Sequence, residues 1–483
     1  MDVFGWLAGT DYTIAREILQ RGVAALYLIA FVSAVNQFPA LLGEHGLLPA
    51  PRFLRHAYAR SQPTLFRWRY SDGMLLAVAW TGAALSALIV AGVVQLAPSW
   101  LLVPVVLIVW FLYLSIVHIG QTFYGFGWES LLCEAGFTVA FLGSWDTAPP
   151  ITIILLVRWL MFRLEFGAGM IKMRGDRSWR DLTALYYHHE TQPMPNPLSR
   201  TAHLLPRWWH RVEVLGNHFA QLVAPWLLFL PQPVASAAAA VVILTQFWLI
   251  ATGNFAWLNW ITVVLAFSAV SDPVWAWATG GAVHGGIGAS GVPLWFAVVA
   301  LAASALLIVL SWWPLRNLFS RHQLMNASFN RWHLVNAYGA FGSVTKQRYE
   351  VVVEGTADDP HDPEAEWREY GFKGKPGEVR RLPRQFAPYH LRLDWLMWFL
   401  ALGSRDSPWF EVFLLRLLQA DRPTLRLLRD DPFDGTAPRA VRARMFLYRF
   451  STRAEKRETG DRWVRTEVGA LVPAVSLRGD DER

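Results

Sequence analysis

Residues 158–197 have the sequence RWLMFRLEFGAGMIKMRGDRSWRDLTALYYHHETQPMPNP, in which an apolar helix runs into a loop dense with charge. Arg158, Glu165 and Lys172 stand seven residues apart. At about 3.6 residues per turn they drift by only about 20° per step, so they share one stripe of the helix. A charge inside a membrane segment costs roughly 2.5–3.5 kcal/mol on insertion scales and persists where it faces a partner or a wet cavity. The stretch therefore predicts a helix packed within a bundle, with its charges in buried ion pairs.

The composition of the whole chain is typical of a membrane protein. It has 483 residues, of which 54% are hydrophobic and 26 are Trp, and a mean hydropathy of +0.26, which is too apolar for an ordinary soluble protein of this length. The formal charge of +7 comes from basic residues in loops and in the C-terminal part, so nucleic acid is not needed to explain it. The single cysteine, Cys133, excludes an intrachain disulfide and a multi-cysteine zinc site. The first residues lack the basic start of a cleaved signal peptide, so the first helix is expected to remain.

Apolar runs of roughly 17–25 residues are long enough to cross a bilayer. Six such runs are clear, at 22–41, 73–97, 99–118, 150–171, 234–252 and 292–313. Three weaker runs, at 129–146, 213–231 and 255–270, are short or carry polar groups. The sequence therefore predicts about nine spans.

The loop and the C-terminal part differ from the spans. Residues 178–189 place aromatic and aliphatic side chains on one face, which predicts a helix at the membrane interface, and the prolines of 192–197 predict an extended turn. After residue 325 the charge rises, and four segments with alternating or β-prone patterns predict strands at 348–354, 366–373, 441–450 and 462–468. Short helices are predicted at 391–402 and 408–419. The expected fold is a polytopic α-helical membrane domain (1–324, with an interfacial loop at 172–212) and a C-terminal soluble α+β, strand-rich domain (325–483).

Charged residues within the apolar helices are candidates for a functional site. They form an expected intramembrane polar network: Glu129, Glu134, Arg158, Arg163, Glu165 and Lys172. Antiparallel packing of the helices near 129–146 and 150–171 could bring them together, either as mutually neutralising ion pairs or as the lining of a wet cavity that binds a polar ligand. Lys172 lies at a helix end, where it could lose its proton and act as a base or extend to the headgroups.

The sequence predicts no metal site and no cofactor. His188 and His189 lack the i, i+4 spacing of a helical zinc pair, and His203 and His210 share a face without an evident carboxylate beside them. No GxSxG motif occurs, so nothing indicates that the chain is itself a lipase.

Several blocks together carry a resemblance to a known family. They are GAGMIKMRGDRSWRDLTALYYHHETQPMPNP (167–197), WWHRVEVLGNHFAQLVAP (208–225), GWESLLCEAGF (127–137), GNFAWLN (253–259), NAYGAFGSVTKQRYEVVVEG (336–355) and APYHLRLDWLMWFLAL (387–402). Taken together in their order along the chain, and over nearly its whole length, they resemble the lipase maturation factor family of membrane proteins. The resemblance implies a chaperone-like maturation factor, not an enzyme, that assists folding or assembly of secreted lipases.

The resemblance also implies site residues and partners. The family-motif loop holds Arg174, Gly175, Asp176, Trp179, Asp181, His189, Glu190, Gln192, Pro193, Asn196 and Pro197. The candidate client surface holds Tyr338, Arg392, Asp394, Trp395 and Trp398. The expected partners are the lipid bilayer and a client lipase, with no nucleic acid, and homo-oligomer formation is left open. With one cysteine, the chain cannot shuttle a disulfide within itself.

Two questions stay open from the sequence. The glycine-rich helix ending at Lys172, followed by Trp179, is more distantly similar to the membrane core of vitamin K-dependent carboxylases, which would make Lys172 a base beside a lipid-soluble cofactor. Intramembrane charge alone would also suit a transporter. The basic loops place the C-terminal domain on the cytoplasmic side, whereas the family resemblance implies the endoplasmic reticulum membrane with the soluble part in the lumen, or the cell membrane of a bacterium.

Overall fold

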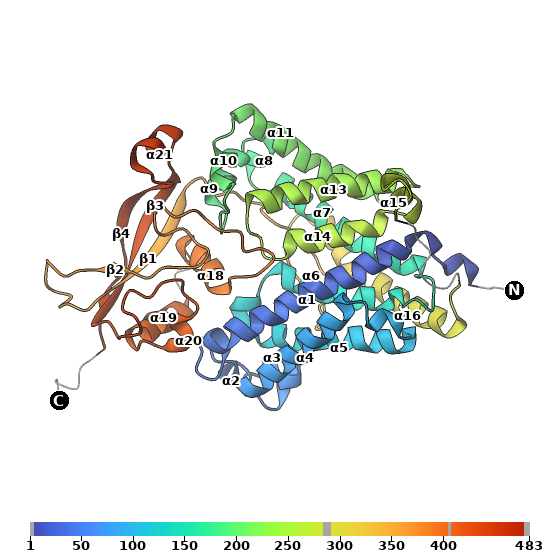
Figure 1. Cartoon of the computed structure of the whole chain (residues 1–483), viewed down its shortest axis with the longest axis horizontal. Helices are drawn as coiled ribbons and strands as arrows, with labels where there is room; N and C mark the ends of the chain where they lie inside the picture. The colour runs from blue at the N-terminus through green and yellow to red at the C-terminus, as the bar shows by residue number, and fades with distance from the viewer. Residues whose placement is uncertain (1–3, 284–290, 404–406, 478–483) are drawn as a thin grey trace.

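The structure, a computed structural model, describes residues 4–283, 291–403 and 407–477. Figure 1 shows a helical bundle at one end of the molecule and a sheet with its own helices at the other, and the chain enters the bundle at the end farthest from the sheet. The long helices are α1 (Thr13–Leu42), α4 (Asp72–Val90), α5 (Ser99–Ile119), α6 (Gly127–Val139), α7 (Ile151–Arg174), α11 (Arg207–His218), α13 (Val234–Thr252) and α16 (Leu294–Leu310). Shorter helices connect them: α2 (Ala50–Phe53), α3 (Ala57–Ser61), α8 (Arg177–Arg180), α9 (Leu185–Thr191), α10 (Ser199–His203), α12 (Ala224–Leu227), α14 (Leu258–Ala266), α15 (Asp272–Ala278) and α17 (Trp312–Leu318).

Fewer helices qualify as membrane spans than the sequence predicts. Among the described residues, five segments are long and apolar enough: Thr10–Leu42, Asp72–Val90, Ser99–Ile119, Val234–Thr252 and Leu294–Leu318. A sixth is added if the bent pair Leu258–Ala269 and Asp272–Ala278, which meet at 103°, is one span. The prediction of about nine spans is therefore not confirmed.

The reasons are local breaks and charge. Within 129–146, α6 ends at Val139, and within 213–231 a π-helical turn, Phe219–Val223, interrupts the helix. Helix α7 fills the predicted run 150–171, but its four buried charges, Arg158, Arg163, Glu165 and Lys172, make it too polar to qualify by composition.

Helix α1 lies against α4, α6 and α14 in the middle of the bundle (Figure 1). Small residues allow this close packing. A Cβ at Gly82 of α4 would collide with the ring of Phe31, and one at Gly136 of α6 would collide with Tyr27. The Tyr27 hydroxyl donates to the Leu132 carbonyl at 2.8 Å, which satisfies a polar group that is otherwise buried in the apolar core.

The C-terminal part is a four-stranded antiparallel sheet with helices packed beside it. The strands are β1 (Arg348–Thr356), β2 (Arg368–Glu369), β3 (Ala440–Phe450) and β4 (Trp463–Val475), in the order β2-β1-β3-β4. Its helices are α18 (Arg392–Ala401), α19 (Pro408–Leu418), α20 (Arg422–Leu425) and α21 (Arg453–Thr459). Three strands and the helices α18 and α19 agree with the sequence prediction, but the strand predicted at 366–373 contains only the two residues of β2.

The single helix predicted at 178–189 is wrong. The segment forms α8 and α9, separated by a turn in which Leu182 has a left-handed φ of 58°. Trp179 is buried and its indole N–H donates to the Phe341 carbonyl at 2.8 Å, so it packs within the protein. This tertiary hydrogen bond is not visible in the aromatic pattern of the segment.

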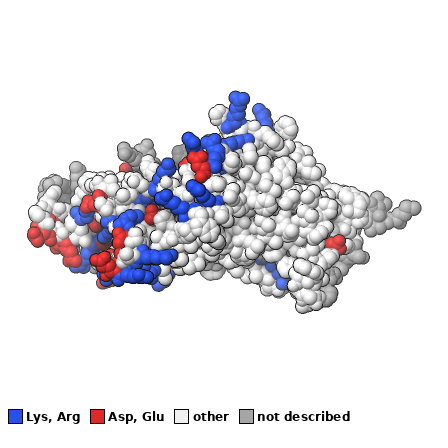
Figure 2. Space-filling view, turned by 90° about the horizontal axis from the view of Figure 1, so that it is seen from above, with Lys and Arg blue, Asp and Glu red and all other residues white. Residues whose placement is uncertain are grey.

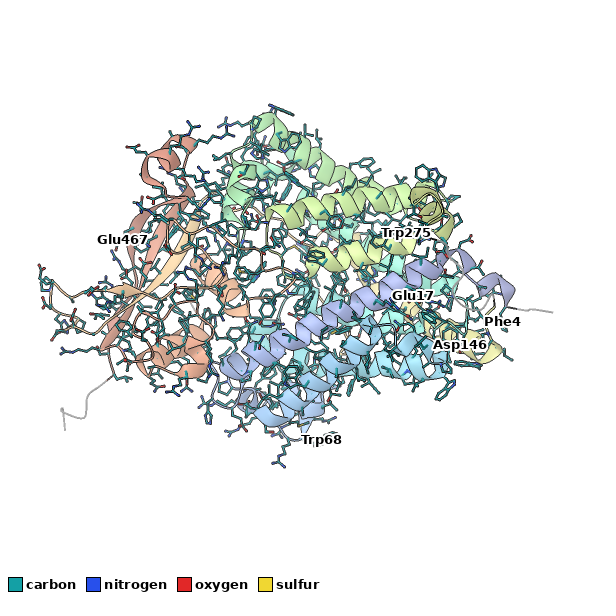
Figure 3. The ribbon with its side chains drawn as sticks, in the orientation of Figure 1. Phe4, Glu17, Trp68, Asp146, Trp275 and Glu467 are labelled. Carbon is teal, nitrogen blue, oxygen red and sulfur yellow. The ribbon has the colours of Figure 1, made fainter. Side chains whose placement is uncertain are left out.

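Charge is unevenly distributed over the surface. Figure 2 shows Lys, Arg, Asp and Glu gathered over the sheet domain and the neighbouring end of the bundle, while most of the remaining bundle surface is uncharged. On the bundle helices α13 and α16, Leu244, Ile308 and Val309 are 69%, 62% and 71% exposed, as expected for helices in contact with lipid. At the end of the bundle far from Glu467 of the sheet, Glu17 and Asp146 lie near each other (Figure 3).

Candidate functional site

A cavity of about 620 Å³ lies between the helices of the bundle and the segment 338–343. Much of its lining is apolar, and it includes the aromatic side chains Phe126, Trp128, Trp179, Trp248, Phe255, Phe341, Trp395 and Trp398. Polar side chains gather on one part of the wall: Glu165, Lys172, His188, His189, Glu213, Gln221, Gln246 and Asn259. An apolar cavity with a few convergent polar groups is the usual form of a small-molecule site.

Lys172 and Glu165 stand two turns apart on α7 and face this cavity. The Lys172 ammonium donates to Gln221 Oε1 at 2.7 Å and lies 4.9 Å from the centre of the Trp179 ring. Gln246 Nε2 donates to Glu165 Oε1 at 2.7 Å. Lys172 is only 4% exposed, so it does not extend to the headgroups, and its buried charge is balanced by Glu165.

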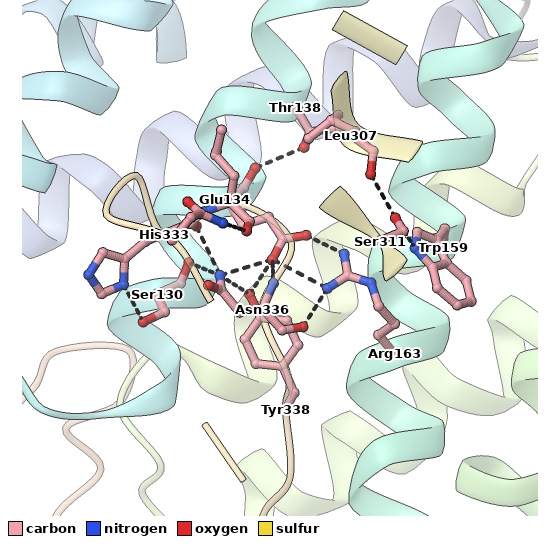
Figure 4. Close-up of polar contacts among 12 residues, drawn as sticks. Ser130, Glu134, Thr138, Trp159, Arg163, Leu307, Ser311, His333, Asn336 and Tyr338 are labelled. Atoms are coloured by element: carbon pink, nitrogen blue, oxygen red, sulfur yellow. Dashed lines mark hydrogen bonds and ion pairs between the residues drawn. The ribbon is translucent and has the colours of Figure 1, made fainter. Parts of the chain in front are cut away.

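A second polar cluster lies between α6, α7 and an extended segment that precedes β1 in the chain (Figure 4). Glu134 and Arg163 form an ion pair in which both side chains are 2% exposed. The Glu134 carboxylate also accepts from Asn336 N at 2.8 Å and from the Tyr338 hydroxyl at 2.7 Å. Arg163 Nη1 donates to the Asn336 carbonyl at 2.6 Å. The segment that follows residue 325 thus enters the bundle and completes a buried ion pair.

A third cluster joins the bundle to the C-terminal part. Glu129 of α6 accepts from Arg392 Nη1 at 2.7 Å and from the hydroxyl of Tyr113. The Arg392 guanidinium lies 3.4 Å from the centre of the Tyr124 ring, and His390 Nδ1 is 3.5 Å from Glu129. Burial, followed by the charge of Arg392, lowers the pKa of His390 to about 4.

Arg158 has a different environment. Its Nε donates to the Ser268 carbonyl at 3.0 Å and its Nη1 to the Leu228 carbonyl at 3.2 Å, with the ring of Tyr12 5.0 Å away. The six predicted network residues therefore lie in four separate neighbourhoods. Glu134 lies with Arg163, and Glu165 lies with Lys172. The other partners come from elements distant in sequence, so a single network is corrected to separate clusters.

The family-motif loop connects three parts of the molecule. Asp176 caps α8 through Ser178 N at 2.8 Å and accepts from Val344 N at 3.3 Å, and the Ser178 bond lowers the pKa of the Asp176 carboxyl. Gly175 lies so close to the Gly342 carbonyl that a Cβ would collide with it. Asn196 Oδ1 accepts from the backbone N–H of Ser199, the first residue of α10, at 3.0 Å. These contacts hold the family-motif loop against the bundle and the segment 341–344.

The remaining loop residues make contacts of the same kind. Arg174 donates to Gln323 at 2.7 Å, Gln192 donates to the Thr252 carbonyl at 2.8 Å, Glu190 accepts from Phe450 N at 2.7 Å, and the Pro193 carbonyl accepts from Arg348 at 3.0 Å. Asp181 pairs with Arg177 on the surface, and Pro197 continues the turn after Asn196. Burial raises the pKa of Glu190, while burial and the neighbouring His189 and Lys172 lower the pKa of His188 to about 3.

The candidate client surface is not a surface. Tyr338, Arg392, Asp394 and Trp395 are 2%, 0%, 1% and 2% exposed, and only Trp398 is partly accessible. Asp394 accepts from Gly374 N at 2.6 Å, and burial raises the pKa of its carboxyl. Trp398 donates to the Thr191 carbonyl at 3.1 Å. These residues hold α18 between the sheet and the bundle.

Sequence reasoning missed several polar residues of these clusters. Gln221, Gln246 and Asn336 each bond a buried charge. A glutamine within the apolar run 234–252 was a visible signal, because polar groups in membrane helices commonly have a partner. The statement that His210 lacks a neighbouring carboxylate is also wrong, since Glu213 Oε2 lies 2.8 Å from His210 Nδ1.

Comparison with known proteins gives matches along both parts of the chain. Residues 14–277 match the family model described as the lipase maturation factor transmembrane domain, and residues 334–473 match the lipase maturation factor C-terminal domain. The chain is 37% identical to lipase maturation factor 1 of Bos taurus, over 98% of this chain and 91% of that protein. It is 38% identical to lipase maturation factor 1 of Homo sapiens (96% and 88%) and 30% identical to human lipase maturation factor 2 (96% and 83%). No solved structure matches.

Proposed function

The chain belongs to the lipase maturation factor family, and we infer from this that it is a membrane-bound maturation factor that assists the folding or assembly of secreted lipases. The observation that carries the proposal is the agreement over both parts: the transmembrane and the C-terminal family models match in order, and the named relatives align along nearly the whole chain. Because the relatives align over both parts of the chain, we expect the function to need the sheet domain as well as the bundle.

The buried contacts between the two parts support different roles for the bundle and the sheet domain. The bundle anchors the protein in the membrane, and Glu129 and Arg392 tie α18 to α6 at 2.7 Å. Asn336 and Tyr338, which belong to the predicted C-terminal domain (325–483), bond Glu134 of the predicted membrane domain (1–324). The sheet domain is thus a fixed platform beside the membrane, and its exposed side and the nearby loops contact the client lipase. The chain acts in the endoplasmic reticulum membrane, with α7 as an additional, protein-buried helix of the bundle.

The carboxylase-like alternative has no support from the family matches or from the named relatives. A catalytic base needs a lysine that loses its proton readily. In the cavity, Lys172 donates to Gln221 and is accompanied by the carboxylate of Glu165 on the same face of α7. Burial lowers the pKa of Lys172, whereas the carboxylate favours its charged form. On the family matches we assign Lys172 a structural role in the proposed maturation factor.

Physical association with a newly made client tests the proposal. The full chain is expressed with a secreted lipase in cultured cells, and proteins are pulse-labelled, lightly cross-linked and captured through a tag on the chain. We expect the new lipase to be captured early and released during the chase, whereas a secreted control protein of similar size that is not a lipase is not captured. Equal capture of the two secreted proteins, or no capture of the lipase, would contradict the proposal.

A further inference from the structure

Helices α9 and α11, at the cavity wall, bring together three residues with metal-binding side chains. His189 lies on α9, and His210 and Glu213 lie one turn apart on α11, which packs against α9 (Figure 1). One ligand atom from each residue lies within 4.8 Å of the other two. Both histidines are 2% exposed, and the Glu213 side chain is 7% exposed. The cluster is therefore shielded from bulk water.

The spacing of the ligand atoms suits a small divalent ion. Around a tetrahedral zinc ion with bonds of roughly 2.0–2.1 Å, neighbouring ligand atoms stand about 3.3 Å apart. Here Glu213 Oε2 lies 2.8 Å from His210 Nδ1, and Glu213 Oε1 lies 3.5 Å from His189 Nε2. The two imidazole ring centres are 5.7 Å apart. Small side-chain rotations bring the three ligand atoms around one ion.

Two of the three residues have outer partners of the kind that metal ligands use. A metal-binding histidine usually donates its other N–H to a carbonyl, and a metal-binding carboxylate accepts an outer hydrogen bond. His210 Nε2 lies 3.3 Å from the His203 carbonyl oxygen, to which it can donate when Nδ1 exchanges its contact with Glu213 for a metal ion. Trp248 Nε1 donates to Glu213 Oε1 at 2.6 Å.

His189 provides an independent observation. Both of its ring nitrogens are buried without a well-aligned hydrogen bond within the described part of the chain, and the carboxylate nearest to Nε2 is Glu213 Oε1, at 3.5 Å. An unsatisfied buried polar atom is costly, by roughly 1–3 kcal/mol, and calls for an explanation. A metal ion shared with Glu213 would provide one for Nε2.

We propose that His189, His210 and Glu213 bind a divalent transition-metal ion, with zinc as the ion that suits this set best. Two imidazoles and one carboxylate, without a fourth protein ligand, are a ligand set of zinc sites that keep one position open. His189 and Glu213 line the cavity, so the open position faces the cavity wall that also carries Lys172 and Glu165. The ion joins α9 to α11 and fixes one side of the cavity.

Metal content of the purified protein tests the site. The full chain is purified in detergent through a tag without histidines, stripped with a chelator, loaded with zinc sulfate and dialysed, and zinc is then measured by mass spectrometry. We expect one zinc ion per chain, and its loss in His210→Gln and in Glu213→Gln. His203→Gln is the matched control, because His203 is an adjacent, partly buried histidine whose side chain lies 3.5 Å from Glu190 instead of Glu213. The control is expected to retain the ion.

A second measurement keeps the test independent of whether the variants fold. Wild-type protein is loaded with cobalt(II), whose visible absorption is strong in a four-coordinate site and weak in an octahedral, water-rich one. We expect the strong spectrum, quenched by added zinc. The proposal is overturned if the wild type retains no zinc after loading, if folded His210→Gln and Glu213→Gln bind as much as the control, or if cobalt gives only the weak spectrum.

Discussion

Removing the Glu134 carboxylate is the sharpest test of how the bundle is held together. Glu134→Ala leaves Arg163 without its buried counter-ion and leaves Asn336 N and the Tyr338 hydroxyl without their acceptor. Breaking a buried ion pair by removing one partner costs roughly 3–5 kcal/mol. Because one factor of ten corresponds to 1.36 kcal/mol, local opening of this region should become roughly 150-fold to 5,000-fold more frequent.

Cys133 gives an assay for this opening. It is the single cysteine of the chain, it is fully buried, and it precedes Glu134 on α6. Its rate of reaction with a fluorogenic maleimide in detergent reports how often α6 is exposed. Thr138→Val on the same helix is the matched control, because it removes only a neutral hydrogen bond of 2.9 Å to the Glu134 carbonyl (Figure 4). A loss of roughly 0.5–1.5 kcal/mol raises the control rate only about 2-fold to 13-fold.

The double variant Glu134→Leu with Arg163→Leu completes the test. Since both charges are removed, the labelling rate should lie below that of either single variant. The account of a stabilising buried pair is refuted if Glu134→Ala labels no faster than Thr138→Val.

Three further predictions follow from the other clusters. Arg392→Met leaves the Glu129 carboxylate buried without its cation, so limited proteolysis should release the sheet domain faster than in wild type; an unchanged cleavage rate would show that this pair does not hold the two parts together. Burial lowers the pKa of His333 to about 4, and burial with the Arg392 charge lowers the pKa of His390 to about 4. Because the same residues in the unfolded chain bind protons near pH 6.5, the melting temperature in detergent should fall as the pH decreases from about 6.5 towards 4. The decrease should be smaller in the double variant His333→Gln with His390→Gln. Lys172→Arg keeps the charge beside Glu165 and should largely preserve lipase maturation, whereas Lys172→Ala should weaken it; a folded, abundant but inactive arginine variant would point to a lysine that must lose its proton.

The sequence predicted the elements whose signal is local. The long apolar runs agree with α1, α4, α5 and α13 because length and hydropathy alone define such helices. The strands β1 and β3 carry their own alternation and agree as well. The predicted helix at 178–189 failed because Trp179 bonds the Phe341 carbonyl, a contact across 162 residues that no local pattern contains.

The candidate sites show the same limit. Spacing on α7 placed Glu165 and Lys172 on one face, and the expected packing of two neighbouring helices brought their charges together without naming the pair of Glu134 with Arg163. The partner of Glu129 could not be found in this way, since Arg392 is 263 residues away in another part of the fold. The pair of His210 and Glu213, at i and i+3, was visible in the sequence, but His189 joins it only because α9 packs on α11.

The specific activity of a secreted lipase tests the central claim most directly. A lipase is expressed, with or without the full chain, in cells that lack their own maturation factor, and the activity in the medium is divided by the amount of lipase protein there. The proposed function predicts that the chain raises this ratio, and that Arg392→Met raises it less. An unchanged ratio, with the chain abundant and folded in the membrane, would contradict the proposed function.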